Sequence, residues 1–212
     1  MAIISIRSDI DRFARTLDDF QRTQLRYATA RALTRTAKIA AADIKRQIPS
    51  VFTAKGPPVP FTINSVGFTH TDSRSKEMRT NVFVKTKQGA YLSIEETGGS
   101  VRSGPGHPII TPVNIDVNRY GNIPRGKLKA LVAGDPKRYF RGSVRGVYGW
   151  WERLPAVHGQ RGRLRLLAAV RSTAHYRPRF GFQRMIATSV KANLVSSLSA
   201  GMAEAMKTAI RR

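Results

Sequence analysis

The chain has 212 residues, no cysteine, and 37 Lys and Arg residues against 13 Asp and Glu, so its formal net charge is +24. The length fits one domain of ordinary size, and the lack of cysteine excludes disulfides and thiolate metal sites. Self-repulsion at this charge opposes compaction unless something acidic screens it. We therefore expect contact with nucleic acid or with acidic protein subunits.

The first part of the chain is predicted to be a short strand, Ala2 to Ile6, followed by a long helix. Ser8 is a candidate N-cap, apolar residues then recur with a helical period as far as Ile48, and Pro49 is expected to end the helix. A helix of about 40 residues would be about 60 Å long. Because of this length we expect the helix either to break or to project along a neighbouring molecule. The alternative interpretation is an ordinary amphipathic helix that covers a sheet.

Three short strands are predicted to follow and to form an antiparallel meander. Residues 61–68 and 81–86 alternate as strands, and the turn at residues 87–89 leads into a third strand that begins at Ala90.

The segment from Ala90 to Pro112 is predicted to pass from the third strand into a loop. This loop is rich in glycine and carries charge, so it is either a flexible connector or an arm that becomes ordered on a partner. We predict an arm at a subunit interface, with the contacts made by Glu95, Glu96, Arg102 and His107.

The section from Arg119 to Arg165 holds twelve Lys or Arg residues and two acids, with aromatic residues between them. Arginines beside aromatic rings suit contacts with phosphates and bases, although the rings would equally serve as core beneath a solvated basic face. Residues 147–154 and 164–172 are predicted to pair as strands around the tip at His158 to Gly162. The predicted contacts with DNA or an acidic partner are Arg125, Lys127, Lys129, Lys137, Arg138, Arg141, Arg145, Arg161, Arg163 and Arg165.

A C-terminal helix is predicted from Gly181 to the end of the chain. Its apolar residues recur every four positions, at Phe182, Ile186, Val190, Leu194, Leu198, Met202, Met206 and Ile210. Because a four-residue step drifts by about 40° on an ideal helix, this stripe winds around the axis. We expect partners on more than one side of the helix, some of them from another subunit.

The residue patterns of catalysis are sparse. The four histidines are scattered without metal-ligand spacing, and Glu95 and Glu96 would point to opposite faces of a strand, so they would not form a carboxylate pair. We predict that the chain is not an enzyme and binds no metal or cofactor. The alternative, an endonuclease or another enzyme, would show a metal-dependent activity that is lost when Glu95 or Glu96 is changed to Gln.

The chain also lacks targeting signals in the sequence given. The apolar run in its first nine residues is too short for a signal peptide, and no segment approaches the roughly 20 apolar residues that span a bilayer. We expect no membrane partner and synthesis in the cytosol.

The order of predicted elements resembles the tail-completion, or neck, proteins of tailed bacteriophages, of the minor tail protein Z type. The likeness lies in the Ala- and Arg-rich run from Arg26 to Lys38, in Tyr91-x-x-x-Glu95-Glu96-x-Gly98, in a loop that reaches Pro112, and in a C-terminal amphipathic helix opened by Phe182. It covers approximately residues 10–112 and 179–212. The family implies a structural virion protein, a homo-oligomeric ring (for example a hexamer) at the head-proximal end of the tail that helps to join tail and head.

Together these observations predict an α+β chain, with a small antiparallel sheet flanked by a long N-terminal and a C-terminal helix. We expect a single domain over residues 1–212, with a core of 8–112 and 179–212 and a long basic loop or β insertion at 113–178. The expected partners are further copies of the chain, other neck or tail proteins such as the terminator, connector or tail tube, and genomic DNA through non-specific contact. The alternative is a free, non-specific nucleic-acid-binding protein.

Overall fold

The computed structural model describes residues 24–53, 56–104, 108–156 and 162–210. The chain forms two compact units. The first, called here the helical unit, comprises the chain up to Ile48, Phe61–Gly89 and the chain from Gly181 onwards, and the second, the sheet unit, comprises Pro49–Pro60 and Ala90–Phe180. Residues 113–178, predicted as an insertion, therefore lie within the sheet unit. The predicted strand at Ala2 to Ile6 and the N-cap Ser8 lie outside the described residues.

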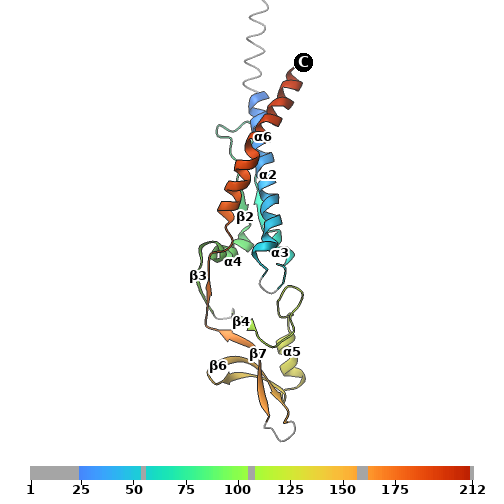
Figure 1. Cartoon of the computed structure of the whole chain (residues 1–212), viewed down its shortest axis with the longest axis vertical. Helices are drawn as coiled ribbons and strands as arrows, with labels where there is room; N and C mark the ends of the chain where they lie inside the picture. Colours follow the sequence, from blue (N-terminus) through green and yellow to red (C-terminus); the bar gives the residue numbers. More distant parts are fainter. Residues whose placement is uncertain (1–23, 54–55, 105–107, 157–161, 211–212) are drawn as a thin grey trace, which may run out of the picture. The chain divides into compact units, whose positions relative to one another are not determined.

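The helical unit is built on two long helices, α2 (Leu25–Val51) and α6 (Phe182–Ile210), which lie side by side in Figure 1. They run antiparallel, because Asp43 accepts a hydrogen bond from Ser189 whereas Arg31 pairs with Glu204. A Cβ atom added at Gly201 of α6 would lie 2.8 Å from the carbonyl oxygen of Ala28. The two backbones therefore approach each other closely where small residues face one another.

The buried face of α2 is made mainly of alanine. Its buried residues are Ala28, Ala30, Ala32, Thr36, Ala37, Ala40, Ala41, Ile44 and Ile48. The prediction that Pro49 ends this helix is wrong, because α2 continues to Val51. A proline this close to the end removes only one backbone hydrogen bond, and buried Ile48 fixes the turn that precedes it.

The buried face of α6 differs from the apolar stripe seen in the sequence. The buried positions are Met185, Ser189, Ser197 and Ala205, whereas Met202 and Met206 of the stripe are exposed and the stripe from Phe182 to Leu198 is only partly buried. Three of the four buried residues are small, as close packing against the alanine face of α2 favours, and most of the large side chains of the stripe stay partly or fully exposed.

A short hairpin completes the helical unit. The strands β1 (Val66–Phe68) and β2 (Val82–Val84) pair antiparallel, which confirms two strands of the predicted meander. The first half of the predicted strand 61–68 instead forms the short helix α3 (Pro60–Ile63). Arg26 of α2 donates hydrogen bonds to the carbonyl oxygens of Ser73 and Ser75 and thus holds the connection between the two strands.

The third predicted strand is wrong: its residues belong to the helix α4 (Thr86–Thr97). Gln88, Leu92 and Glu95 are its buried positions, and their spacing of four and three residues is that of one helix face. Apolar Leu92 and Ile94 alternate with polar Ser93 and Glu95, which favoured a strand, and Gly89 suggested a turn.

The sheet unit contains two antiparallel sheets. The four-stranded sheet has the order β4 (Ile109–Pro112), β7 (Arg163–Arg171), β6 (Val147–Leu154) and β5 (Tyr139–Val144). The two-stranded sheet pairs β3 (Gly99–Arg102) with β8 (Thr173–Tyr176). The predicted pairing of residues 147–154 with 164–172 is confirmed.

The core of the sheet unit lies where helix α5 (Lys127–Gly134) packs on the four-stranded sheet. Leu128 meets Trp150, Leu167 and Ala168, with further apolar side chains around them at Ile115, Ile123, Leu131, Val132, Tyr139 and Val170. One of the aromatic residues of the basic section, Trp150, is thus core. The fold class predicted from the sequence, α+β with long helices and small antiparallel sheets, is confirmed.

Candidate basic interface of the sheet unit

The four-stranded sheet places a single carboxylate between two of the predicted contact arginines. Glu152 on β6 is the cross-strand neighbour of Arg165 on β7, and Arg138 precedes β5 beside it. Arg138 donates from Nε and Nη2 to Oε1 of Glu152 at 2.8 and 2.6 Å, and Arg165 donates from Nε to Oε2 at 2.8 Å, with a second bond from Nη2. The Glu152 side chain is only 1% exposed, whereas the two arginines are about half exposed.

The two arginines determine the ionisation of this carboxyl group. Burial raises the pKa of Glu152, but the hydrogen bonds from Arg138 and Arg165 outweigh it, so that the pKa lies below its ordinary value. The hydrogen bond to Glu152 in turn raises the pKa of Arg138. Arg138 and Arg165 therefore act first as counter-ions inside the chain, and only their remaining N–H groups are available to a partner.

Further arginines of the sheet unit lie over aromatic rings. The guanidinium carbon of Arg141 is 4.9 Å from the ring centre of Trp150 and 5.2 Å from that of Tyr148, and that of Arg153 is 4.1 Å from the ring of Phe140. Such pairs hold the guanidinium in place over the ring, and Nη1 of Arg153 also donates to the carbonyl oxygen of Lys137 at 2.8 Å. Trp150 thus packs in the core beneath a basic face, whereas contact of these arginines with phosphates or bases stays a prediction.

A groove of about 540 Å³ brings three of the predicted contacts together. Its lining includes Arg125, Lys129 and Arg141, with Trp150 at the sheet and no acidic residue. The rest of the lining is mostly apolar or small: Pro108, Ile110, Pro112, Gly121, Asn122, Ile123, Pro124, Gly126 and Leu128. Cations around an apolar floor suit an anionic group attached to an apolar or flat body.

The remaining predicted cations are not gathered at this groove. Lys127 pairs with Asp116 at 3.2 Å. Lys137 and Arg163 are exposed elsewhere in the unit, and Arg145 stands at the tip of the β5–β6 hairpin. There Arg145 and Gly146 both have positive φ, at 49° and 78°, as a two-residue hairpin turn requires. Arg161 lies outside the described residues.

One residue of the predicted subunit arm, Glu95, pairs within its own chain. Glu95 is a buried residue of α4, and Arg179 of the same chain donates to its two carboxylate oxygens at 2.5 and 2.9 Å. The backbone N–H groups of Arg179 and Phe180 also donate to the carbonyl oxygen of Glu95, both at 2.8 Å. A neighbour's arginine is therefore not needed to neutralise Glu95, which fastens α4 to the end of the segment that follows β8.

The other arm residues are distributed along the same segment. Glu96 is partly buried on α4, and Arg102 is exposed on the short strand β3. His107 lies outside the described residues. The helix corrects the argument that Glu95 and Glu96 alternate on a strand, although adjacent residues on a helix do not converge either.

Two arginines that make contacts in the sheet unit, Arg153 and Arg179, were not among the site residues predicted from the sequence. Arg153 lies within the basic section but received no role, and Arg179 lies 84 residues from its partner Glu95. A buried carboxylate in so basic a chain implies an arginine partner, but the sequence alone does not say which one.

Among the described residues, no group of three or more His, Cys, Asp or Glu side chains is placed to hold a metal ion. Within the same residues, no helix is both long and apolar enough to cross a membrane.

Comparisons with family models, with curated proteins and with solved structures gave no match.

Proposed function

We propose that the chain is a structural, non-enzymatic virion protein of a tailed bacteriophage, a tail-completion protein that forms a homo-oligomeric ring at the neck and helps to join tail and head. The proposal rests on the resemblance in the order of elements and on two properties of the molecule, its charge and the surface of α6.

The main support is an excess of positive charge that cannot be neutralised within the chain. Carboxylates of both units form ion pairs with the chain's own cations, at Asp43, Glu77, Glu95, Asp116, Glu152 and Glu204. The formal net charge nevertheless remains +24. In a virion, acidic subunits of the neck and the DNA that passes through it would supply the missing negative charge.

The exposed apolar side chains of α6 give further support. Val195 is 72% exposed and Met206 56% exposed on the helix whose small residues pack on α2. A ring needs a contact between copies, and flexible methionine side chains suit such a contact. This fits the expectation that α6 has partners from another subunit.

Electron microscopy of the purified protein, alone and mixed with tails that lack it, tests the proposal. We expect rings of uniform diameter and added density at the head-proximal end of the tails. A protein that stays monomeric and leaves the tails unchanged would contradict it.

A second candidate function, non-specific nucleic-acid binding by the free protein, is favoured by the groove around Arg125, Lys129 and Arg141. It predicts that the logarithm of DNA affinity falls linearly with the logarithm of salt concentration. An electrophoretic mobility assay at low salt checks this, and lack of a shift there would remove the candidate.

A further inference from the structure

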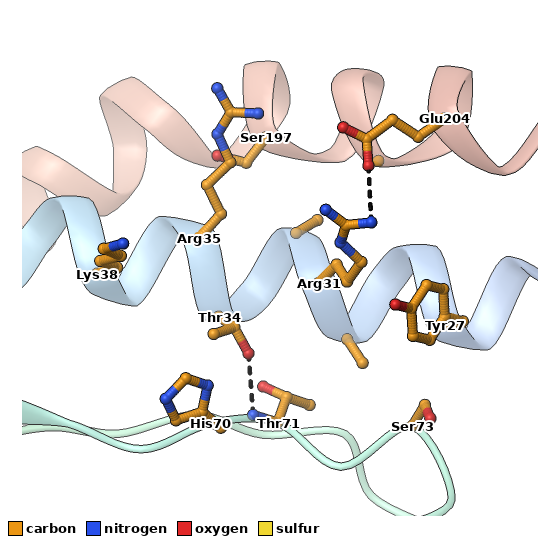
Figure 2. A pocket seen from close by; sticks show the side chains of 13 residues that line it. Tyr27, Arg31, Thr34, Arg35, Lys38, His70, Thr71, Ser73, Ser197 and Glu204 are labelled. Carbon is orange, nitrogen blue, oxygen red and sulfur yellow. Dashed lines mark hydrogen bonds and ion pairs between the residues drawn. The ribbon is translucent and has the colours of Figure 1, made fainter.

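A second pocket, of about 440 Å³, lies in the helical unit between α2, α6 and the chain that follows β1. Figure 2 shows Tyr27, Arg31, Arg35 and Lys38 along α2, with Glu204 on the facing helix. None of these residues was singled out by the sequence for binding.

The pocket carries a positive charge that its own acid does not balance. Arg31 donates to Glu204 at 3.1 Å. Within the described part of the chain Arg35 and Lys38 form no ion pair, so Arg31, Arg35, Lys38 and Glu204 together leave a formal charge of 3 − 1 = +2. Figure 2 shows the Arg35 side chain extending from α2 toward α6, where Ser197 lies.

Two hydroxyl groups of the pocket lining are buried without a hydrogen-bond partner among the described residues. They are Oγ of Ser197, a residue that is 2% exposed, and Oγ1 of Thr71. The backbone N–H of Thr71 does have a partner, the hydroxyl of Thr34 at 3.0 Å. A buried hydroxyl without a partner costs free energy, so its presence at the wall of a cationic pocket calls for an acceptor that enters the pocket.

We propose that this pocket binds the carboxylate side chain of an acidic segment from a protein partner. A carboxylate accepts several hydrogen bonds at once. It therefore suits the guanidinium fork of Arg35, the ammonium of Lys38 and the hydroxyl of Ser197 together.

A side chain suits this pocket better than duplex DNA does. Ser197 is 2% exposed and lies between two helices, a place that suits one narrow group, whereas the phosphates of a duplex follow the outside of a wide rod. The pocket also differs from the groove of the sheet unit, whose lining holds no acid. The inference does not depend on the tail assignment, because ring formation and this pocket are tested by different measurements.

Fluorescence anisotropy of labelled hexaglutamate, titrated with the full chain at low salt, tests the proposal. The double variant R35Q/K38Q is compared with R184Q/K191Q, which makes the same change in net charge at exposed residues of α6 outside the pocket lining. We expect the pocket variant to weaken binding about tenfold more than the control, as the loss of charge-assisted hydrogen bonds implies. Equal weakening by both variants would show a diffuse charge effect and would overturn the proposal.

The variant S197A separates a specific site from charge alone, because it leaves the net charge unchanged. We expect it to weaken hexaglutamate binding about threefold or more through the lost hydroxyl donor, with an unchanged circular dichroism spectrum. Unchanged binding by S197A would contradict the role of Ser197. A single-stranded oligothymidine that binds more tightly than hexaglutamate, with the same dependence on Arg35 and Lys38, would overturn the choice of a carboxylate ligand.

Discussion

The two units of the molecule use arginine in different ways. In the sheet unit, Arg138 and Arg165 enclose one buried carboxylate and Arg141 covers aromatic rings. In the helical unit the helices meet through small residues, and Arg35 and Lys38 line a pocket without an ion pair in the described chain. Net charge therefore does not identify the residues that contact a partner, because some cations hold the fold together and others remain available.

The largest effect is expected from Glu152→Gln. The change leaves Arg138 and Arg165 facing each other without their shared counter-charge, and we expect the sheet unit to lose about 3 kcal/mol, the lower end for breaking a buried ion pair because both arginines stay half exposed to water. Urea unfolding followed by tryptophan fluorescence measures this, since both tryptophans of the chain, Trp150 and Trp151, lie in this unit.

The matched control is Glu77→Gln, which removes a carboxylate that pairs with Arg79 while both side chains are largely exposed. We expect no measurable change there. Equal stability of both variants would show that the Glu152 cluster does not hold the sheet together.

In the helical unit, Gly201→Ala tests the close approach of α2 and α6. The new methyl group would lie 2.8 Å from the carbonyl oxygen of Ala28, so the helices must move apart, and we expect a loss of about 2 kcal/mol. Unfolding followed by circular dichroism at 222 nm reports it.

The same substitution in α4, Gly89→Ala, meets no atom within 4 Å. It should stabilise the chain by about 0.5–1 kcal/mol, because alanine favours a helix more than glycine does. Stabilisation by both substitutions would mean that α2 and α6 are less tightly packed than described.

The sheet unit should also be the more acid-sensitive unit. The pKa of Glu152 is lowered in the folded state, so its contribution to the free energy of unfolding is full above the unfolded pKa of about 4.3 and is lost as pH falls through the folded value. Tryptophan-monitored stability of the unaltered chain should therefore decline below about pH 4.3. The decline should be smaller in E152Q, which has no carboxyl group at this position to protonate. The same decline in E152Q as in the unaltered chain would assign the acid sensitivity to other groups.

A small loss of stability is expected from Arg141→Gln. The loss of its contacts with Trp150 and Tyr148 should cost about 0.5–1 kcal/mol. If the groove binds an anionic partner, the same variant should weaken DNA binding in the mobility assay more than Lys137→Gln, which alters an exposed residue outside the groove lining. Equal effects of the two variants would remove the groove as a specific site.

Short-range patterns in the sequence predicted three elements, β6, β7 and α6, but not the helix α4. The segments 147–154 and 164–172, on either side of a glycine-containing tip, predicted β6 and β7, and the apolar spacing after Gly181 predicted α6. They failed at α4, where Gly89 and the alternation of residues 92–95 imitate a turn and a strand although the buried positions Gln88, Leu92 and Glu95 have helical spacing.

Contacts between distant parts of the chain could not be predicted. The pairing of β3 with β8 and the bond between Glu95 and Arg179 join residues more than 70 positions apart, and no local pattern marks which partner each will find. For the same reason Glu152 was recognised only as one of two acids in a basic section. On α6 the largest apolar residues suggested the buried face, but the alanines of α2 accept small neighbours instead.

The most direct test of the proposed ring is sedimentation velocity of the full chain over a range of concentrations, with V195Q/M206Q as the comparison. Both side chains are exposed in the single chain, so the double variant should keep its unfolding free energy. We predict that the full chain sediments as one discrete oligomer and that this oligomer dissociates in the double variant. A chain that sediments as a monomer at every concentration, or an oligomer indifferent to both substitutions, would contradict an α6-mediated ring.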